Sequence, residues 1–487
     1  FSSLTVAQNY EEIPMFKTKV KSGELPPMKD RIPKDPYVAK PVDDIGQYGG
    51  TVNTVTVQPK SWGEDIFMMA PFANLIRPTP AGKNFVNHLA NNIEVKNNMT
   101  TYTIHLREGT KWSDGHPFTA EDIMFWYEDI LTNQELTPAI SSAFKAEGEV
   151  VNVKKLDKYT VKFTFAEPKP YFRNRLAVWS GNVYAPKHYL KQFHPNYVSK
   201  NELTQKVKEA GFDNWWELFQ DKNYVCGGVP MNPDLPCLTA YRLKQISSSR
   251  RILERNPYYW KVDTEGNQLP YIDKIKTDLV SNKELVNGKI LDGNVDFAVF
   301  NTDVRNYPMY KKYEEKSGYK TILLNGLPNS VIYMINMTHQ EPELRKIFQD
   351  LRFRKALSFA IDREEINETI YYGKAEPRQC TVADSSQWYK PEYAEAYVEY
   401  NPEKAKDLLN EIGIVDKDGD GWRERFDGKK LDFTIEYYAL EAPKTPNAEL
   451  VSEYWREIGI DVDIKNISGQ LQMQRAPANL LDATLFH

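Results

Sequence analysis

The chain has 487 residues, of which 41% are hydrophobic and 26% charged, and this composition is typical of a globular protein of roughly three domains. Its net charge of −5 at pH 7 argues against a nucleic-acid-binding protein, which would carry a basic face. No apolar run reaches the about 18–20 residues that span a bilayer, and three cysteines are too few for a disulfide scaffold. Aromatic residues make up 13% of the chain; large cores explain this, and aromatic rings also supply flat surfaces for a ligand.

The first half of the chain predicts strands and one well-marked helix. Residues 1–50 are rich in proline and mixed charges, which favours an extended arm over a helix. Thr119 precedes an apolar stripe, and Asp122 stands at the capping-box position, so a helix is expected to begin there. Alternating or β-branched residues predict strands at 51–57, 101–107 and 159–165.

The second half alternates helices and strands, which predicts an α/β layered domain. In one helix Asn401 is the expected N-cap, Pro402 the first helical residue and Gly413 the stop. A second helix presents one apolar stripe and is followed by a strand at 460–466. That stripe consists of Val451, Tyr454, Trp455 and Ile458.

Catalytic motifs are missing from the sequence. The seven histidines form no HExxH pattern, and neither a GxSxG elbow nor a GxxxxGK[ST] phosphate-binding loop occurs. The sequence does not exclude the two opposed carboxylates of a glycosidase, because 67 acidic residues offer many pairings. The pattern as a whole points away from an enzyme.

The segment DKDGDGWRERFD, residues 416–427, has the spacing of an EF-hand loop. Aspartates stand at positions one, three, five and twelve, glycine at six, and oxygen ligands at those steps suit Ca²⁺. A strand is expected after the loop, so the full helix–loop–helix of an EF-hand is not expected here. The alternative is a solvated acidic turn that joins a helix to a strand. The calcium ligands would be Asp416, Asp418, Asp420, Trp422 and Asp427.

The three cysteines allow one disulfide that the sequence alone neither requires nor excludes. Cys226 and Cys237 flank a ten-residue loop that a disulfide could close in an oxidising compartment, and two separate thiols are the alternative. Cys380 would then be left over, as a buried rather than a reactive thiol.

Several segments together resemble the family 5 extracellular solute-binding proteins, which are large receptors of ABC importers. Residues 101–130 are similar to the family signature of a strand ending in Leu-Arg, a Trp-Ser-Asp-Gly turn and a Thr-Ala-Glu-Asp helix start. Further similar segments are YAPKHYL at 184–190, LERNPYYW at 253–260 and LRFRKALSFAIDREEI at 351–366.

This resemblance implies an α/β fold of the bilobal periplasmic-binding-protein type, class II-like, with an extra inserted domain. Lobe one would comprise residues 1–57 and 166–275, the inserted domain 58–165 and the second lobe 276–487. The ligand would lie in an interlobe cleft that closes by a hinge. The family's chain normally continues well beyond the LDATLFH segment at 481–487 to finish the second lobe and return to lobe one, so site residues from that part are not carried over.

The resemblance leaves two ligand classes, of which we favour oligosaccharides over oligopeptides, because aromatic-rich polar sites suit sugars. Trp62, Trp179 and Tyr241 are the candidates for stacking on or lining a ligand, and Asn336 for a hydrogen bond. For each of the four, a packed core or surface residue is the alternative.

The resulting hypothesis is a non-enzymatic receptor that captures an oligosaccharide and delivers it to a membrane permease. It would be a monomer in the periplasm or outside the cell; a lipid anchor stays open, since any lipobox cysteine would lie upstream. Apart from Ca²⁺ no cofactor is expected. The alternatives are an oligopeptide receptor, a secreted carbohydrate-active hydrolase and a sensing or chaperone-like receptor.

Overall fold

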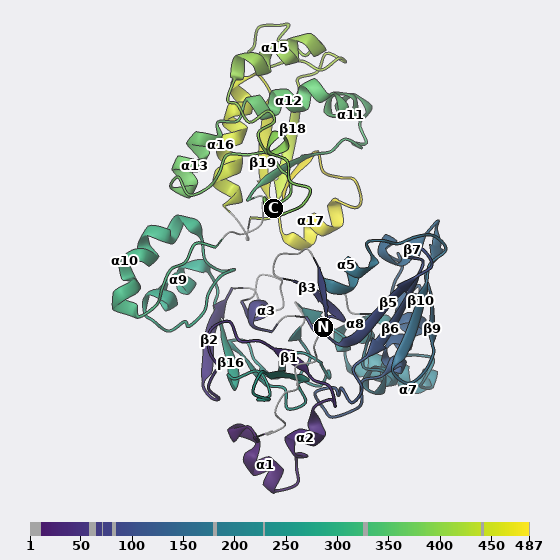
Figure 1. Ribbon diagram of the computed structural model, residues 1–487. Coiled ribbons are helices and arrows are strands. Elements are labelled where there is room, and N and C mark those ends of the chain that lie inside the picture. The colour runs from purple at the N-terminus through teal and green to yellow at the C-terminus, as the bar shows by residue number, and fades with distance from the viewer. Residues whose placement is uncertain are drawn as a thin grey trace. The chain divides into compact units, whose positions relative to one another are not determined.

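A computed structural model describes residues 11–57, 65–70, 72–79, 84–178, 183–226, 229–324, 330–439 and 443–486. The chain divides into two compact units, unit 1 over residues 1–301 and unit 2 over 302–487 (Figure 1). The boundary predicted at residue 276 is therefore wrong, because the strand at 274–279 and the helix at 283–291 both belong to unit 1. The strand that begins at Lys274 runs parallel to the strand at 51–56, which lies within the segment predicted at 51–57. The Asp296 carboxylate accepts hydrogen bonds from the backbone and side chain of Asn53 at 2.7 and 2.8 Å.

The main sheet of unit 1 mixes antiparallel and parallel pairs. A hairpin of two strands pairs antiparallel with the strand at 274–279, and that strand pairs parallel with the strand at 51–56. Its order is β13 (Tyr241–Ile246), β14 (Arg250–Arg255), β16 (Lys274–Leu279) and β2 (Thr51–Thr56).

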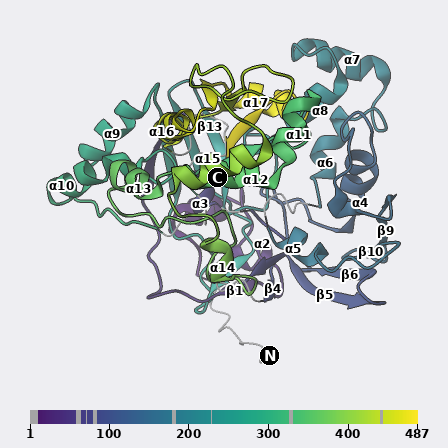
Figure 2. The same cartoon turned by 90° about the horizontal axis from the view of Figure 1, so that it is seen from above.

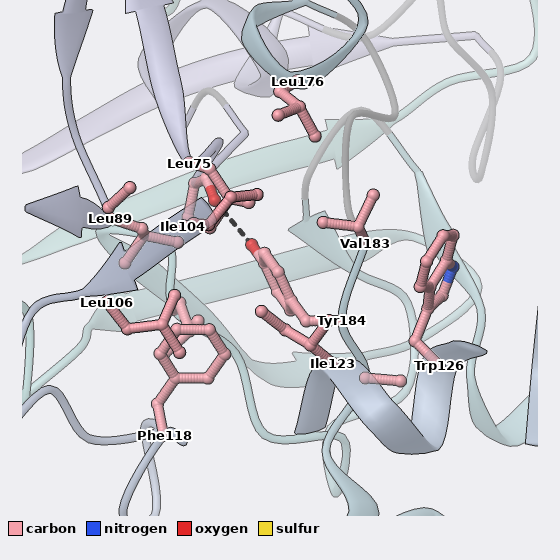
Figure 3. Packing of buried hydrophobic residues seen from close by; sticks show 14 of the residues in the cluster. Leu75, Leu89, Ile104, Leu106, Phe118, Ile123, Trp126, Leu176, Val183 and Tyr184 are labelled. Carbon is pink, nitrogen blue, oxygen red and sulfur yellow. Dashed lines mark hydrogen bonds between the residues drawn. The ribbon is translucent and has the colours of Figure 1, made fainter. Parts of the chain in front are cut away.

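The second sheet of unit 1 is antiparallel throughout, and two of its strands lie in the segments predicted at 101–107 and 159–165. The prediction for strand 101–107 is confirmed, because Tyr102, Ile104 and Leu106 are buried. Neighbouring side chains from several loops complete this core, and the Tyr184 hydroxyl donates to the Ala73 carbonyl at 2.6 Å (Figure 3). The strand order is β5 (Ala90–Lys96), β6 (Thr101–Leu106), β10 (Thr160–Thr164) and β9 (Asn152–Lys155).

The N-terminal arm departs from the prediction, because it contains two short helices, α1 (Lys17–Lys21) and α2 (Met28–Arg31). The guanidinium of Arg31 is buried, pairs with Glu12 at 2.7 Å and donates to the Pro257 carbonyl at 3.0 Å. These bonds hold the arm on the rest of unit 1. The arm continues into β1 (Tyr37–Ala39), which pairs parallel with β15 (Lys261–Asp263).

Unit 2 contains the α/β layer that the second half of the sequence predicts. Three of its strands run parallel, and the fourth, β17, is antiparallel to its neighbour. The side chains of Ile435 and Leu485 face a core that includes Trp455. The strand order is β17 (Ile332–Ile335), β20 (Ala483–Phe486), β18 (Asp432–Tyr437) and β19 (Asp461–Asn466).

The helices of unit 2 confirm the predicted caps. Asn401 accepts a hydrogen bond from the Lys404 backbone at 3.0 Å, and Gly413 ends the same helix with a left-handed φ of 88°. The helix between residues 402 and 412 packs against the helix between 351 and 359 (Figure 2). The helices are α11 (Pro342–Gln349), α12 (Leu351–Phe359), α13 (Arg363–Tyr371), α15 (Pro402–Ile412), α16 (Lys444–Glu457) and α17 (Gly469–Arg475).

The remaining longer elements complete the two units, and they include a π-helical turn at Trp126–Leu131 that follows α4. Among the described residues, no helix combines the length and the apolarity that a bilayer crossing needs. These elements are α3 (Ile66–Met69), β3 (Ile76–Pro78), β4 (Phe85–Asn87), α4 (Ala120–Phe125), α5 (Phe172–Ala177), α6 (Lys187–Leu190), α7 (Lys200–Glu209), α8 (Trp215–Lys222), α9 (Lys283–Leu291), α10 (Tyr307–Ser317) and α14 (Pro391–Ala394).

Candidate functional site

The parallel strands of unit 2 end together at one edge of the sheet. The chain leaves β18, passes through α16 and enters β19 on one side, and it then returns through α17 to β20 on the other side of β18. The two connections therefore leave the carboxyl ends of β18 and β19. In open α/β sheets, ligands bind in the crevice outside the carboxyl ends of the strands. We call this region, where Tyr437, Asn466 and Phe486 end their strands, the carboxyl edge.

Aromatic and basic side chains meet at the carboxyl edge. Phe486 is the last residue of β20 and is 48% exposed. The Lys444 side chain, from the first residue of α16, is 2% exposed, and its ammonium lies 5.8 Å from the centroid of the Phe486 ring. Tyr438, directly after β18, lies beside Gly469 at the start of α17, where an added Cβ would be 3.5 Å from the tyrosine ring. Tyr438 and Lys444 flank the connection from β18 to α16, whereas Gly469 and Phe486 come from two other segments.

Polar contacts to two strands hold helix α17 at this edge. The Arg475 guanidinium binds the Glu436 carboxylate with two hydrogen bonds of 2.8 and 3.0 Å. The Gln472 amide donates to the Thr484 hydroxyl at 2.7 Å. Because the carboxylate and the guanidinium neutralise each other, this part of the edge suits an uncharged polar ligand.

A cavity of about 490 Å³ lies along β17, the terminal strand of this sheet in the described part of the chain. Three guanidinium groups line it, from Arg354, Arg363 and Arg378, together with side chains of α12, α13 and α16. Burial lowers the pKa of Arg363 to about 10. The cavity borders the outer side of a strand rather than the carboxyl ends of parallel strands, so we place the candidate ligand site at the carboxyl edge.

Unit 1 has its own pair of parallel strand ends, at β2 and β16. Val57, directly after β2, donates its backbone N–H to the Asn301 side chain at 3.3 Å. The Asp65 carboxylate accepts the backbone N–H groups of Val299 and Phe300, both at 2.8 Å. These bonds fasten the last residues of unit 1 to the carboxyl end of β2.

The four predicted ligand contacts are not brought together by the described structure. Trp62 and Trp179 lie outside the described residues. The prediction for Tyr241 is wrong within unit 1, because its side chain is 4% exposed and its hydroxyl donates to the Ile272 carbonyl at 3.1 Å, which leaves no ring face for stacking. The Asn336 amide donates to Asn479 at 2.9 Å and to the Leu481 carbonyl at 2.7 Å; its role toward a ligand stays a prediction.

None of the residues at the carboxyl edge was among the site residues predicted from the sequence. Phe486 ends an alternating segment, and Lys444 follows a predicted strand after a short loop, so each was visible as a strand-end residue. Selecting them required the order of the strands, because only the order shows which ends are neighbours.

The predicted calcium loop gathers four carboxylates, and one of them differs from the prediction. Oxygen atoms of Asp416, Asp418, Asp420 and Glu424 all lie within 4.8 Å of one another. Glu424 stands at position nine of the loop, which EF-hand loops also use. Asp427 is excluded from this group, because Arg425 binds its carboxylate, with Nε at 3.0 Å, and this hydrogen bond lowers the pKa of Asp427 to about 2. The carbonyl of Trp422 stays a predicted ligand.

Of the open cysteine pairing, the structure describes the side chain of Cys237 alone. Cys237 is a free, buried thiol whose Sγ lies 3.5 Å from the Tyr241 carbonyl oxygen, and the Cys226 side chain lies outside the described part of the chain. Cys380 is free and exposed, contrary to the prediction of a buried side chain, because it lies in the loop that follows α13.

The segment at 101–130 builds local structure in unit 1. Trp112 is a buried core residue, and the side chains of Thr119 and Asp122 form the predicted capping box at the start of α4. Asp122 also accepts the Lys187 backbone N–H at 3.3 Å. Burial raises the pKa of Asp122 to about 6. The segment therefore holds α4 and α6 in place.

The sequence matches one known protein family over most of its length. Residues 84–487 match the family model described as Bacterial extracellular solute-binding proteins, family 5 Middle. Among curated proteins, the chain is 28% identical over 435 residues to the periplasmic alpha-galactoside-binding protein of Rhizobium meliloti (strain 1021), covering 83% of this chain and 59% of that protein. It is 25% identical over 386 residues to the periplasmic oligopeptide-binding protein OppA of Salmonella typhimurium, covering 75% and 60% of the two chains. The chain thus spans about 60% of the length of these relatives.

Solved structures give the same two ligand classes. The chain is 38% identical to a structure named oligopeptide-binding protein OppA, with a TM-score of 0.68, covering 98% of this chain and 75% of that one. It is 25% identical to the periplasmic binding protein MelB of Agrobacterium fabrum C58 in complex with stachyose, with a TM-score of 0.76, covering 99% and 74%.

Proposed function

Because the chain belongs to family 5 of the bacterial extracellular solute-binding proteins, we propose that it captures an oligosaccharide and delivers it to the permease of an ABC importer. The observation that carries the sugar class is the similarity to MelB, which was solved with stachyose, at a TM-score of 0.76. The relative named for alpha-galactosides, at 28% identity over 83% of this chain, supports the same class.

The carboxyl edge of unit 2 supports this proposal chemically. A sugar offers hydroxyl groups and C–H faces but no charge, and it is bound by polar side chains next to rigid aromatic rings. The carboxyl edge offers this combination in Gln472, the paired charges of Glu436 and Arg475, and the exposed ring of Phe486.

The ligand leaves unaltered in this proposal, since the family consists of solute-binding proteins and binding alone accounts for its role. We place the protein in the periplasm or outside the cell, as the names of its relatives suggest, and expect a monomer that docks on the permease. Lipid anchoring stays a separate hypothesis.

An oligopeptide receptor is the second candidate, and one observation favours it. The structure named oligopeptide-binding protein OppA shares 38% identity with this chain over 98% of its length. A peptide receptor would bind backbone amides and tolerate varied side chains, whereas a sugar receptor would reject peptides.

Isothermal titration calorimetry against stachyose, raffinose and a peptide set that includes a nonapeptide tests both candidates. We expect binding heat with the galactosides and none with the peptides. Chromatography of the sugar after incubation with the protein should return it uncleaved, and a cleaved product would favour the hydrolase alternative. Binding of peptides without any binding of sugars would overturn the proposal.

We also propose that the loop at 416–427 binds a structural Ca²⁺ ion. Carboxylate oxygens suit this ion, and four of them lie close together at positions one, three, five and nine of the loop. The ion would relieve the repulsion among these carboxylates and stabilise the connection between α15 and β18.

A further inference from the structure

We propose that Lys261 is a modification site, at which carbon dioxide adds to the side-chain amine and forms a carbamate. This inference is independent of the proposed function. Lys261 is the first residue of β15, it pairs in register with Tyr37 of β1, and it is only 7% exposed. Its side chain therefore lies enclosed where the N-terminal arm, which continues into β1, meets the rest of unit 1.

Aromatic rings surround the Lys261 nitrogen where a carboxylate would be expected. The nitrogen lies 5.1 Å from the ring centroid of Trp260, 5.2 Å from that of Tyr37 and 5.7 Å from that of Tyr259. Within the described part of the chain, neither a hydrogen bond nor an ion pair reaches this nitrogen. Rings attract a cation, but they do not replace the hydration that a buried ammonium loses, so burial favours the neutral amine.

A second basic side chain, His88, packs against two of these rings. Its ring centroid lies 4.5 Å from that of Trp260 and 5.3 Å from that of Tyr37. Its Nδ1 donates to the Asn74 carbonyl at 2.9 Å, and its Nε2 is buried without a hydrogen-bond partner among the described residues. Burial lowers the pKa of His88 well below its ordinary value, so the ring is neutral and its Nε2 is an unused acceptor.

Two arginines lie near this group of side chains, and the carboxylate beside them is already paired. Arg107 donates to the His88 carbonyl at 2.8 Å and to the Asp35 carboxylate at 3.1 Å. Burial, together with the positive charge of the exposed Arg77 of β3, lowers the pKa of Lys261 to about 7. About half of the Lys261 amine is therefore neutral, and nucleophilic, at pH 7.

The reaction needs only the neutral amine and one molecule of carbon dioxide. The Nζ lone pair attacks the carbon atom, a C–N bond forms, and one electron pair of a C=O double bond moves to its oxygen. Nζ then releases one proton to solvent, which leaves a carbamate, –NH–COO⁻, and no atom is oxidised or reduced. Carbon dioxide is small and uncharged, so it can reach an amine on a residue that is 7% exposed, whereas larger electrophiles are excluded.

The surroundings of Lys261 suit the carbamate better than the ammonium. The modification exchanges a cation that has no carboxylate partner for an anion near Arg77 and Arg107. An opposite charge nearby stabilises an ionised group. The Nε2 of His88 is an acceptor available for the N–H that stays on the carbamate nitrogen. Because Tyr37 belongs to the N-terminal arm, we expect the modification to stabilise the arm on β15.

The first experiment uses cyanate, which is similar to carbon dioxide in size and adds to a neutral amine to give a stable urea. Reaction of the full chain at pH 7 is followed for each lysine by digestion and peptide mass spectrometry. Lys158 is the matched control, because its nitrogen lies 5.2 Å from the Tyr159 ring centroid but the residue is exposed. We expect Lys261 to react at least about tenfold faster, since exposed lysines, whose ordinary pKa is about 10.4, are almost fully protonated at pH 7. Dissolved carbon dioxide at constant pH should slow the reaction at Lys261 and leave that at Lys158 unchanged.

The second experiment detects the carbamate itself by carbon-13 NMR of the protein in labelled bicarbonate, which supplies dissolved carbon dioxide. We expect a carbamate resonance that is lost in Lys261→Arg and retained in Lys158→Arg. Arg77→Gln changes an exposed residue and keeps the lysine, so it replaces Lys261→Arg if that variant does not fold. In Arg77→Gln the resonance should weaken severalfold, because loss of the cation raises the pKa of the amine and removes a charge that stabilises the carbamate. A resonance common to all variants belongs to another amine, such as an α-amino group.

Several results would overturn the proposal. One is a Lys261 that reacts with cyanate no faster than Lys158, and another is a reaction at Lys261 that carbon dioxide does not slow. A third is an unmodified protein whose carbamate resonances are absent, or are the same as those of Lys261→Arg or of Arg77→Gln. None of these results depends on which ligand the protein binds, so the proposed function is tested separately.

Discussion

The antiparallel sheet of unit 1 and the parallel sheet of unit 2 relate differently to the sequence. In the first, the strands β5, β6, β10 and β9 all lie within residues 90–164, and the local alternation of the sequence predicts β6 and β10. In the second, the order β17, β20, β18 and β19 joins segments up to about 150 residues apart. The difference matters for function, because only the order of the second sheet creates an edge at which unrelated segments meet.

The largest expected effect tests whether the two units unfold separately. Trp455 is buried in the unit 2 core and donates to the Leu357 carbonyl at 2.9 Å, and Trp260 is its counterpart in unit 1, donating to the Leu238 carbonyl at 3.0 Å. Each alanine substitution should remove about 3–5 kcal/mol of unfolding free energy. Urea unfolding followed by circular dichroism should show two transitions, of which each variant shifts a different one. A single transition that both variants shift alike would mean that the units unfold as one.

Calcium should stabilise unit 2 and leave unit 1 unchanged. At a hundred times its dissociation constant, a bound ion adds about 2.7 kcal/mol to the unfolding free energy. Asp418→Asn should abolish this increment. Asp427→Asn serves as the control and should retain it, because the Asp427 carboxylate is bound by Arg425 outside the cluster. Unfolding curves that are identical in Ca²⁺ and in a chelator would exclude the site.

Asp122 should make the stability of unit 1 depend on pH. Burial raises its pKa to about 6 in the folded chain, so between about pH 4 and pH 6 the folded state holds a proton that the unfolded chain has released. The contribution of this group is therefore greatest at low pH, and it declines by about 2 kcal/mol as the pH rises through that window. Urea unfolding at three pH values should show this decline, and Asp122→Asn, which does not titrate, should have a correspondingly shallower decline. Equal slopes for the two proteins would contradict the assignment.

The smallest expected effect concerns the cap of α15. Asn401 accepts the Lys404 N–H, and its replacement by alanine should cost about 1 kcal/mol of unit 2 stability. Asn401→Asp retains an acceptor oxygen and should cost little. Both values come from the unit 2 transition in urea, and an alanine variant as stable as the unmodified protein would show that the cap is not needed once the helix is packed.

Local features of the chain were predictable because they depend on neighbours in sequence. The capping box of Thr119 and Asp122, the Asn401 cap and the Gly413 stop are all found where the pattern predicts them, since hydrogen bonds within one helical turn determine them. The arm before residue 50 was predicted less well. Its helices are short, and their hold on unit 1 depends on the distant carbonyl of Pro257.

The candidate site could not be predicted in the same way. Tyr241 was chosen for its residue type, and the fold buries it. Asp427 had the right spacing for a calcium ligand, but Arg425 takes its carboxylate, and Glu424 joins the cluster instead. In each case a contact that spacing does not reveal decided the outcome.

The sequence by itself determined the family, the helix ends and the alternating strands, because these depend on residue types at fixed short spacings. The tertiary structure decided the boundary between the two units, the order of the strands in unit 2 and the group of residues at its carboxyl edge. The physical reason is that strand pairing and burial are settled by contacts between distant segments, and no local pattern records which distant segments meet.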